Sequence, residues 1–335
     1  MGYHCAVAEY DCDMLIIGAG PTGLYAAYYA GFRGFSVIIM DALPEAGGQI
    51  TAMYPEKDIF DVAGFPTVKG RALVEGLVAQ AGQFNPTYLL GEQAVSLETS
   101  EDELAVVTSD AGTVITTKSV VICGGIGSFK PRPIPVGAEW VDKGVVYFVP
   151  RLDDHAGKDI VIVGGGDSAL DWAWSLKPIA KSVSVIHRRD EFRAHASMVD
   201  KVRDAGVRLI TSSQISELRG DDVVTEIDVK SNNDGSIETL QVQTVVAALG
   251  FIANIGPMAK WGLELEKRRI VVDTTMKTNL PRVYAAGDIN VYPGKVAIIA
   301  VGFGEAALAV NNAAPLISPE YGVFPGHSSG GEGGE

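Results

Sequence analysis

Residues 13 to 23 read Asp13-Met14-Leu15-Ile16-Ile17-Gly18-Ala19-Gly20-Pro21-Thr22-Gly23, an apolar run that leads into a GxGxxG motif. The run predicts a buried strand, and the motif predicts a tight turn into a helix. In such a turn, Gly18, Gly20 and Gly23 let a pyrophosphate approach the backbone, and the helix that starts near Thr22 points its N-terminus at it. Asp41 lies 23 residues after Gly18, where the next strand should end. An acid at this place binds ribose hydroxyls, which favours FAD.

A second copy of the motif, Gly164-Gly165-Gly166-Asp167-Ser168-Ala169, follows the apolar run 159–163. Here the position 23 residues after the first glycine holds His187, and Arg188 and Arg189 come next. An arginine pair suits a 2′-phosphate, so the second unit should bind NADPH through its glycine loop, Gly164, Gly166, Ser168 and Ala169, and through these basic residues. Two alternatives remain open: Asp41 could cap a turn, and Arg188 and Arg189 could be solvated surface residues. The shared offset argues against both.

The composition limits the classes of protein to which the chain can belong. Its 335 residues are 47% hydrophobic with 39 glycines, which suits two compact α/β domains. Apolar runs of membrane-spanning length and a basic leader are both missing, so we expect a soluble cytoplasmic protein. The net charge of −14 disfavours nucleic acid and anionic membrane as partners. Cys5, Cys12 and Cys123 are too few for a disulfide framework, a zinc site or a CxxC redox pair, and no metal is expected.

The remaining patterns predict a nested pair of domains. A discontinuous FAD-binding domain should comprise residues 1–130 and 254–335, with an NADPH-binding domain at 131–253. Alternating runs predict strands at 94–98, 104–108 and 113–116, and a second meander at roughly 214–243. The other expected strands are 13–17, 36–40, 119–123, 160–163, 183–187, 207–210, 245–250 and 283–288, with helices from about 22 and at 71–83, 167–177, 195–204 and 296–311. The N-terminus of the last helix should face the flavin pyrimidine ring.

Both glycine motifs, Gly47-Gly48-Gln49, His187-Arg188-Arg189 with Arg193, and Ala286-Gly287-Asp288 together resemble the thioredoxin reductase architecture. The resemblance covers almost the whole chain. It implies an α/β fold of two Rossmann-like three-layer nucleotide-binding domains, the NADPH domain inserted in the FAD domain. Thioredoxin reductases carry a redox CxxC shortly before the second glycine motif, but residues 147–154 here contain no cysteine. Without a dithiol beside the flavin, electrons cannot leave by thiol–disulfide exchange.

Residues 54–66 and 324–329 resemble a cysteine-free branch, the thioredoxin-reductase-like ferredoxin–NADP reductases. Members are homodimers in which a C-terminal tail covers the flavin of the other subunit. The resemblance implies that Tyr54 stacks on one flavin face and that His327 of the tail stacks on the other, where it must move aside for hydride transfer. The positions that match FAD contacts of the family are Asp41, Gln49, Tyr54, Ala94, Phe129, Asp288 and Ser329.

The implied function is electron transfer between NADPH and ferredoxin or flavodoxin. A flavin can take up two electrons as hydride and release them one at a time. This chemistry needs no general base, and the five histidines form no recognisable catalytic set. Two alternatives stay open, an NADPH oxidase or diaphorase that reduces oxygen or quinones, and a nonenzymatic FAD-binding scaffold. Because ferredoxins are acidic, docking needs a basic patch, for which the candidates are Arg33, Lys57, Lys69, Arg71 and Lys295.

Overall fold

The structure is a computed structural model that describes residues 8–324 and residue 326. The chain divides into two compact units, each of which is described by itself. The first unit comprises the chain up to Thr51, Asp58–Ser128 and the part from Ala253 onward. The second unit comprises Ala52–Lys57 and Phe129–Ile252 and is therefore nested within the first.

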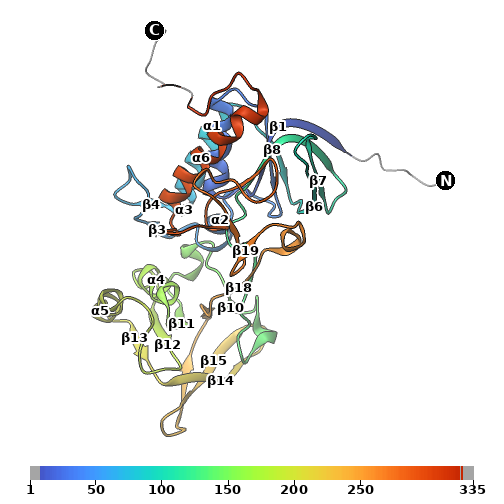
Figure 1. Cartoon of the computed structure of the whole chain (residues 1–335). Coiled ribbons are helices and arrows are strands. Elements are labelled where there is room, and N and C mark those ends of the chain that lie inside the picture. Colours follow the sequence, from blue (N-terminus) through green and yellow to red (C-terminus); the bar gives the residue numbers. More distant parts are fainter. Residues whose placement is uncertain (1–7, 325, 327–335) are drawn as a thin grey trace, which may run out of the picture. The chain divides into compact units, whose positions relative to one another are not determined.

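A mainly parallel sheet forms the centre of the first unit (Figure 1). Its parallel strands lie in the order β5 (Thr87–Leu90), β2 (Val37–Asp41), β1 (Glu9–Ile17), β8 (Val114–Ile122) and β21 (Val283–Ala285). The apolar residues of β1 and β2 are buried on both sheet faces, as parallel strands require. Three helices pack side by side, with α1 (Pro21–Phe32) between α3 (Gly70–Gly82) and α6 (Ile299–Ile317).

Strand β8 belongs to two parts of the sheet at once. Its first half pairs antiparallel with β7 (Ala105–Ser109), which pairs with β6 (Ala94–Glu98), and its second half pairs in parallel with β21. The expectation of two separate strands at 113–116 and 119–123 is therefore wrong, because one nine-residue strand spans both. The sequence pattern changes from alternating to continuously apolar within β8 because its second half is covered on both faces.

The second unit has three layers. A parallel sheet in the order β10 (Val145–Val146), β17 (Thr244–Ala247), β11 (Asp159–Val163), β12 (Ser182–Ile186) and β13 (Arg208–Ile210) lies between two helices and a meander. Along β11, Ile160 and Ile162 pack against α4 (Asp167–Leu176) and α5 (Ala196–Asp204), and Val161 faces the meander. This alternation of side chains places one apolar core on each face of the sheet.

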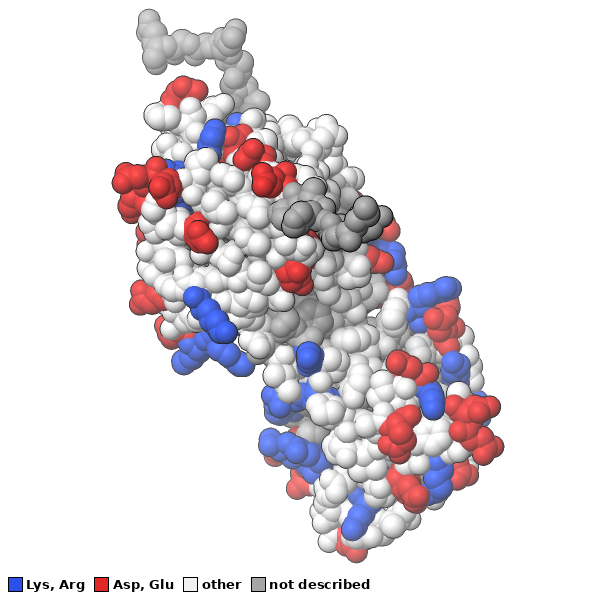
Figure 2. Space-filling model, turned by 90° about the vertical axis from the view of Figure 1, so that its right-hand side faces the viewer, with Lys and Arg blue, Asp and Glu red and all other residues white. Residues whose placement is uncertain are grey.

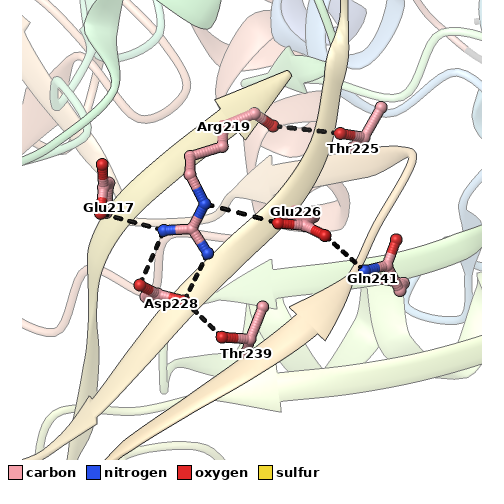
Figure 3. Close-up of polar contacts among 7 residues, drawn as sticks. All are labelled: Glu217, Arg219, Thr225, Glu226, Asp228, Thr239 and Gln241. Carbon is pink, nitrogen blue, oxygen red and sulfur yellow. Dashed lines mark hydrogen bonds and ion pairs between the residues drawn. The ribbon is translucent and has the colours of Figure 1, made fainter.

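The meander consists of β14 (Ser213–Gly220), β15 (Val224–Ser231) and β16 (Ile237–Gln241). Its outer face carries an ion-pair network centred on Arg219 (Figure 3). The Arg219 guanidinium forms two hydrogen bonds with Asp228, at 2.7 and 2.8 Å, and also contacts Glu217 and Glu226. Because most members of the network reach solvent, we expect it to contribute little to stability.

Shorter elements complete both units. They are α2 (Gln49–Met53), the hairpin β3 (Asp58–Ile59) and β4 (Val68–Lys69), the pair β9 (Ser128–Pro131) and β18 (Phe251–Asn254), and the sheet β19 (Leu265–Glu266), β20 (Arg269–Val271) and β22 (Asn290–Val291). The helix expected at 296–311 starts only at Ile299, because Ile298 is extended, and it continues through Pro315 to Ile317. None of the helices in the described part of the chain combines the length and apolarity needed to cross a membrane.

Charged side chains are distributed differently on the two units. Figure 2 shows one face, on which acidic side chains lie scattered over the first unit, with broad uncharged areas between them. On the second unit, basic and acidic side chains lie close together.

Candidate nucleotide-binding sites

The first glycine loop, Gly18–Gly23, connects β1 to α1, and each of its glycines has a distinct packing role. A Cβ at Gly18, whose φ is +115°, would lie 2.4 Å from the carbonyl oxygen of Cys123, and one at Gly23 would lie 1.8 Å from that of Gly18. At Gly20 a Cβ would meet nothing within 4 Å. The strand end and the helix thus pack as closely as backbone permits, and the loop leaves open space at Gly20. The first residue of α1 follows Gly20, and no side chain caps the helix, so its N–H groups suit a pyrophosphate.

Asp41 ends β2 and is bound to the first glycine loop. Its Oδ2 accepts a hydrogen bond of 2.6 Å from the Ala19 N–H, and its Oδ1 accepts one of 2.8 Å from the Leu43 N–H. Burial raises the pKa of this carboxyl group, although the two N–H donors act in the opposite direction. Each oxygen keeps a lone pair. A half-buried carboxylate in this state suits the hydroxyls of a ribose.

Gln49 lies beside the same loop. Its segment is held there because the Gly47 N–H donates to the Ala19 carbonyl oxygen at 2.8 Å, and a Cβ on Gly48 would lie 3.0 Å from the Cα of Gly20. The Gln49 amide lies next to the turn after β8, where a Cβ on Gly125 would lie 2.9 Å from Nε2. The structure thus brings together the loop that follows β2 and the turn that follows β8.

Thr22, in the first turn of α1, packs against α6 and against the segment that follows β21. A Cβ on Gly302 of α6 would lie 2.5 Å from Thr22 Oγ1, and one on Gly287 would lie 2.9 Å from it. The first turns of α1 and α6 therefore meet at the end of β21. Asp288 follows directly and is half-buried, and its carboxylate has no hydrogen-bond or ion-pair partner among the described residues. It is available to accept hydrogen bonds from a polyol.

Glu305 and Lys295 form a buried pair that the sequence analysis did not identify. Only 3% of each side chain is exposed, and Lys295 Nζ contacts Glu305 Oε1. One sequence feature could have indicated this pair: Glu305 is the only charged residue of helix α6. Lys295 is therefore no part of a surface docking patch.

Arg33 is buried too and donates to the Gly322 and Val323 carbonyl oxygens at 2.9 and 3.3 Å, so it is also removed from the docking candidates.

The other expected flavin contacts have fewer described contacts with the first glycine loop, or lie outside it. Ala94 is buried at the start of β6, and the nearby Glu92 N–H donates to the Asp41 carbonyl oxygen at 3.1 Å. Phe129 lies in β9, and its side chain is not described. Tyr54 groups with the second unit, where it packs against the apolar cluster under α4, with Lys57 Nζ 5.7 Å from its ring centre. His327 and Ser329 lie outside the described residues.

The second glycine loop, Gly164–Ala169, connects β11 to α4 in the same manner. A Cβ on Gly164 would lie 2.4 Å from the Ala248 carbonyl oxygen, and the Ala169 side chain fills the space behind it. Gly166 immediately precedes α4, which has no side-chain cap, and Ser168 is exposed in the first turn. This N-terminus repeats the anion-binding geometry of the first unit.

His187 lies beneath this loop and is buried. A Cβ on Gly165 would lie 2.2 Å from its ring, Phe192 stacks on it at 5.3 Å, and Nε2 lies 3.1 Å from the Glu191 carbonyl oxygen. Desolvation lowers its pKa, as do the charges of Arg193, Arg189 and Arg188, while the bond to Glu191 opposes them. A carbonyl oxygen only accepts, so the neutral ring uses its one N–H there. No N–H remains for a phosphate, and the expected phosphate contact of His187 is not supported.

Arg188, Arg189 and Arg193 are exposed, and none forms an ion pair within the described part of the chain. Their backbone is fixed. The Arg188 and Arg189 carbonyl oxygens accept hydrogen bonds from Asn232 Nδ2 and the Ser212 N–H, and the Arg193 N–H donates to the Gly165 carbonyl oxygen at 2.7 Å. Three unpaired guanidinium groups at one loop form a suitable site for a phosphate.

Neither described cysteine offers a reactive thiolate to the nucleotide sites. Cys12 and Cys123 are free, and Cys5 lies outside the described residues. Burial raises the pKa of Cys12 to about 11 and raises that of Cys123 as well, so neither is a thiolate at neutral pH. Among the residues that the structure describes, no group of three or more His, Cys, Asp or Glu residues could hold a metal ion.

Two nested α/β units, each with a glycine loop and a charged residue after its second strand, define an oxidoreductase that binds two dinucleotides. A family model described as "Pyridine nucleotide-disulphide oxidoreductase" matches residues 12–313. The chain belongs to this family. Its near relatives within the family carry the name ferredoxin–NADP reductase. A "Ferredoxin–NADP reductase" of Nocardioides sp. is 58% identical over 96% of this chain and 98% of its own length. One from Frankia casuarinae is 56% identical over 94% and 98%.

Solved structures agree with the fold. Thioredoxin reductase of T. acidophilum is 27% identical, covers 92% of this chain and 98% of its own, and has a TM-score of 0.77. Thioredoxin reductase of Lactococcus lactis has a TM-score of 0.75 at 23% identity, over 92% of this chain and 99% of its own. The α/β fold of two Rossmann-like three-layer domains is thus confirmed.

Proposed function

We infer that the chain is a ferredoxin–NADP reductase, a flavoprotein that transfers electrons between NADPH and ferredoxin. The observation that carries this function is the pair of glycine loops, of which the first leads to a carboxylate at Asp41 and the second to unpaired arginines. Near relatives with the name of this activity support it. Bound FAD supplies the coupling between a two-electron donor and a one-electron acceptor.

In the first unit, we propose that the α1 N-terminus with Gly18, Gly20, Thr22 and Gly23 binds the FAD pyrophosphate. Asp41 accepts hydrogen bonds from the ribose, and Gln49 and Asp288 contact the flavin and its ribityl chain. Ala94 and Phe129 are the further FAD contacts that we propose. The open space at Gly20, the uncapped helix and the free Asp288 carboxylate support this assignment.

In the second unit, the α4 N-terminus with Gly164, Gly166, Ser168 and Ala169 binds the NADPH pyrophosphate. Arg188, Arg189 and Arg193 hold the 2′-phosphate, because each can donate charge-assisted hydrogen bonds to it. His187 supports the loop from below instead of donating to the phosphate, as its hydrogen bond to Glu191 favours. We propose that 131–253 is the NADPH-binding domain and that 1–130 with 254–335 is the FAD-binding domain.

A homodimer is the assembly that we propose. The rings of Tyr25, Tyr28, Phe32 and Phe303 contact one another in sequence along α1 and α6, and Phe84 joins them at Tyr28. Helix α1 carries no charged residue, and Phe32 and Phe84 are exposed. We call these five residues the aromatic face. An apolar surface on a chain of net charge −14 suits contact with a second copy of the same face.

We further propose that Tyr54 and His327 stack on the two faces of the flavin, that Ser329 contacts it, and that the tail of one subunit shields the flavin of the other. Truncation before Pro325 should then speed reoxidation by oxygen, whereas removal of residues after Gly330 should have no effect. Arg33 supports this proposal, because its guanidinium holds the chain at Gly322 and Val323, just before the tail begins. Equal oxygen reactivity of the truncated and full-length proteins would exclude shielding. We also propose a cytoplasmic location.

The function is tested by NADPH-driven reduction of cytochrome c through ferredoxin, with flavodoxin as a second carrier. A variant with Cys5, Cys12 and Cys123 all replaced by serine should keep near-native turnover. Loss of turnover with FAD still bound and the fold intact would contradict a cysteine-free route. Fast peroxide formation with slow ferredoxin reduction would instead indicate an oxidase, and failure of NADPH to bleach the flavin would indicate a binding scaffold.

A further inference from the structure

Glu305 is a buried carboxylate that receives four hydrogen bonds. Its Oε2 accepts from the Gly287 N–H at 2.7 Å and from Asn290 Nδ2 at 3.1 Å. Its Oε1 accepts from the Tyr292 hydroxyl at 2.7 Å and from Lys295 Nζ at 2.5 Å. A carboxylate offers about four lone-pair sites. This one therefore has all of its acceptor capacity in use within the protein.

Lys295 completes the arrangement from the other side. Its Nζ also donates to the Gly287 carbonyl oxygen at 3.0 Å, so the pair binds both peptide groups of one residue, the N–H through Glu305 and the C=O through Lys295. A buried ion pair contributes little net stability, because desolvation offsets the attraction. Its effect is to fix position and orientation.

Gly287 is the residue whose orientation is fixed. Its φ of +84° is in the left-handed region, and a Cβ there would lie 2.9 Å from Thr22 Oγ1. Gly287 is thus packed against the N-terminus of α1, and its two polar groups are bound to the pair. Asp288 follows it in the chain and has no hydrogen-bond or ion-pair partner among the described residues. The direction of the Asp288 side chain is consequently set by the peptide that the pair holds.

We propose that Lys295 and Glu305 are positioning residues for the flavin half of FAD, which act by fixing the Gly287 peptide groups and hence the Asp288 carboxylate. The proposal rests on the proposed function, because Asp288 is there a ligand of the ribityl chain. The proposal also distinguishes the flavin half of the FAD site, which the pair should affect, from the ADP half, which it should not. The ADP half of FAD lies with the first glycine loop and Asp41, and the hydrogen bonds of the pair described above go to neither of them directly.

The test is calorimetric titration of flavin-free protein with FAD and, separately, with ADP, in saturating NADP⁺ so that the second unit is filled. Lys295→Met should raise the FAD dissociation constant about 10- to 100-fold and leave that of ADP unchanged. Glu305→Gln keeps the side-chain volume and should act in the same direction if Lys295→Met does not fold. Lys118→Met is the matched control, because it breaks the partly exposed Lys118–Asp13 pair in the same unit and should alter neither constant.

A double-mutant cycle with Asp288→Ala separates positioning from general loosening. If Lys295 acts through Asp288, the Lys295→Met/Asp288→Ala protein should bind FAD no more weakly than Asp288→Ala alone. Unchanged FAD affinity in both Lys295→Met and Glu305→Gln would overturn the proposal, as would a parallel loss of ADP affinity or full additivity in the cycle. A native protein that binds no FAD would instead overturn the proposed function itself.

Discussion

At the scale of single residues, the second nucleotide site is distinguished by three arginines that have no carboxylate partner in the described part of the chain. Several other arginines of the same unit are paired, as Arg203 is with Asp200 and Arg208 with Glu238. Unpaired guanidinium groups beside a glycine loop are what a doubly charged phosphate requires. We therefore expect this site to favour NADPH over NADH.

Replacement of both Arg188 and Arg189 by alanine should raise the Michaelis constant for NADPH roughly a hundredfold, because the charge-assisted hydrogen bonds to the 2′-phosphate are lost. The constant for NADH should hardly change. Steady-state kinetics with both nucleotides measures this, and Arg203→Ala, which removes a paired arginine of the same unit, is the control. A native protein that prefers NADH would refute the assignment.

Two buried histidines of the second unit should make its stability depend on pH. Desolvation lowers the pKa of His155 and of His187 below the ordinary 6.5, so the folded state binds fewer protons than the unfolded chain. Their contribution is fully present above that value and is lost as the pH falls below it. Calorimetry should show a lower unfolding temperature at about pH 5.5 than at about pH 7.5, and a smaller difference in His155→Gln and His187→Gln. Equal pH dependence in the variants and the native protein would disprove this linkage.

Sequence reasoning located the candidate residues that follow from motif position, and it did not predict the surroundings of residues whose environment depends on tertiary packing. The offset of Asp41 from Gly18 predicted a carboxylate at the end of β2, and the structure has it there, bound to Ala19. Burial of Lys295 and Arg33 left no trace in the local sequence, because their partners lie on other elements. The same holds for His187, whose N–H is used by a carbonyl group four residues later.

At the scale of elements, the two glycine loops set how closely a helix can approach its strand. At Gly23 an added Cβ would lie 1.8 Å from a backbone oxygen, which cannot move aside as a flexible side chain could. At Gly76, in the middle of α3, an added Cβ would meet nothing within 4 Å. The two positions form a matched pair of helical glycines.

Gly23→Ala should displace the start of α1 and abolish FAD binding. Gly76→Ala should leave binding intact and stabilise the protein by about 0.5–1 kcal/mol, because alanine loses less backbone entropy in a helix. Flavin content after purification and denaturant unfolding measure the two effects. Normal flavin content in Gly23→Ala would show that the close contact of strand and helix is not needed for the site.

The long elements followed from periodicity, whereas short ones did not. Helices α3, α4 and α5 lie within about two residues of the expected bounds, and α1 starts one residue before the expected start. Two-residue strands such as β10 and β22 exist only because a neighbouring strand supplies their hydrogen bonds, so the local sequence does not encode them. The start of α6 was placed too early, because Val296 and Ile298 are apolar but exposed outside the helix.

At the scale of the whole molecule, the aromatic face predicts the assembly. Tyr28→Glu together with Phe32→Glu should convert a dimer into a monomer, because both place a charge among stacked rings. Phe60→Glu, at an exposed phenylalanine outside this face, is the control. Sedimentation velocity measures the mass. A native monomer, or a double variant that stays dimeric, would exclude this face as the interface.

The central claim, that electrons pass from NADPH to a one-electron carrier without a dithiol, is tested most directly by stopped-flow mixing. Protein reduced with NADPH is mixed anaerobically with oxidised ferredoxin and, in parallel, with oxidised thioredoxin. Ferredoxin should reoxidise the flavin rapidly, and more slowly at high salt, because salt screens the attraction between opposite charges at the docking site. Thioredoxin should not reoxidise it. Reoxidation by thioredoxin, or reoxidation by ferredoxin that is slower than by dissolved oxygen, would contradict it.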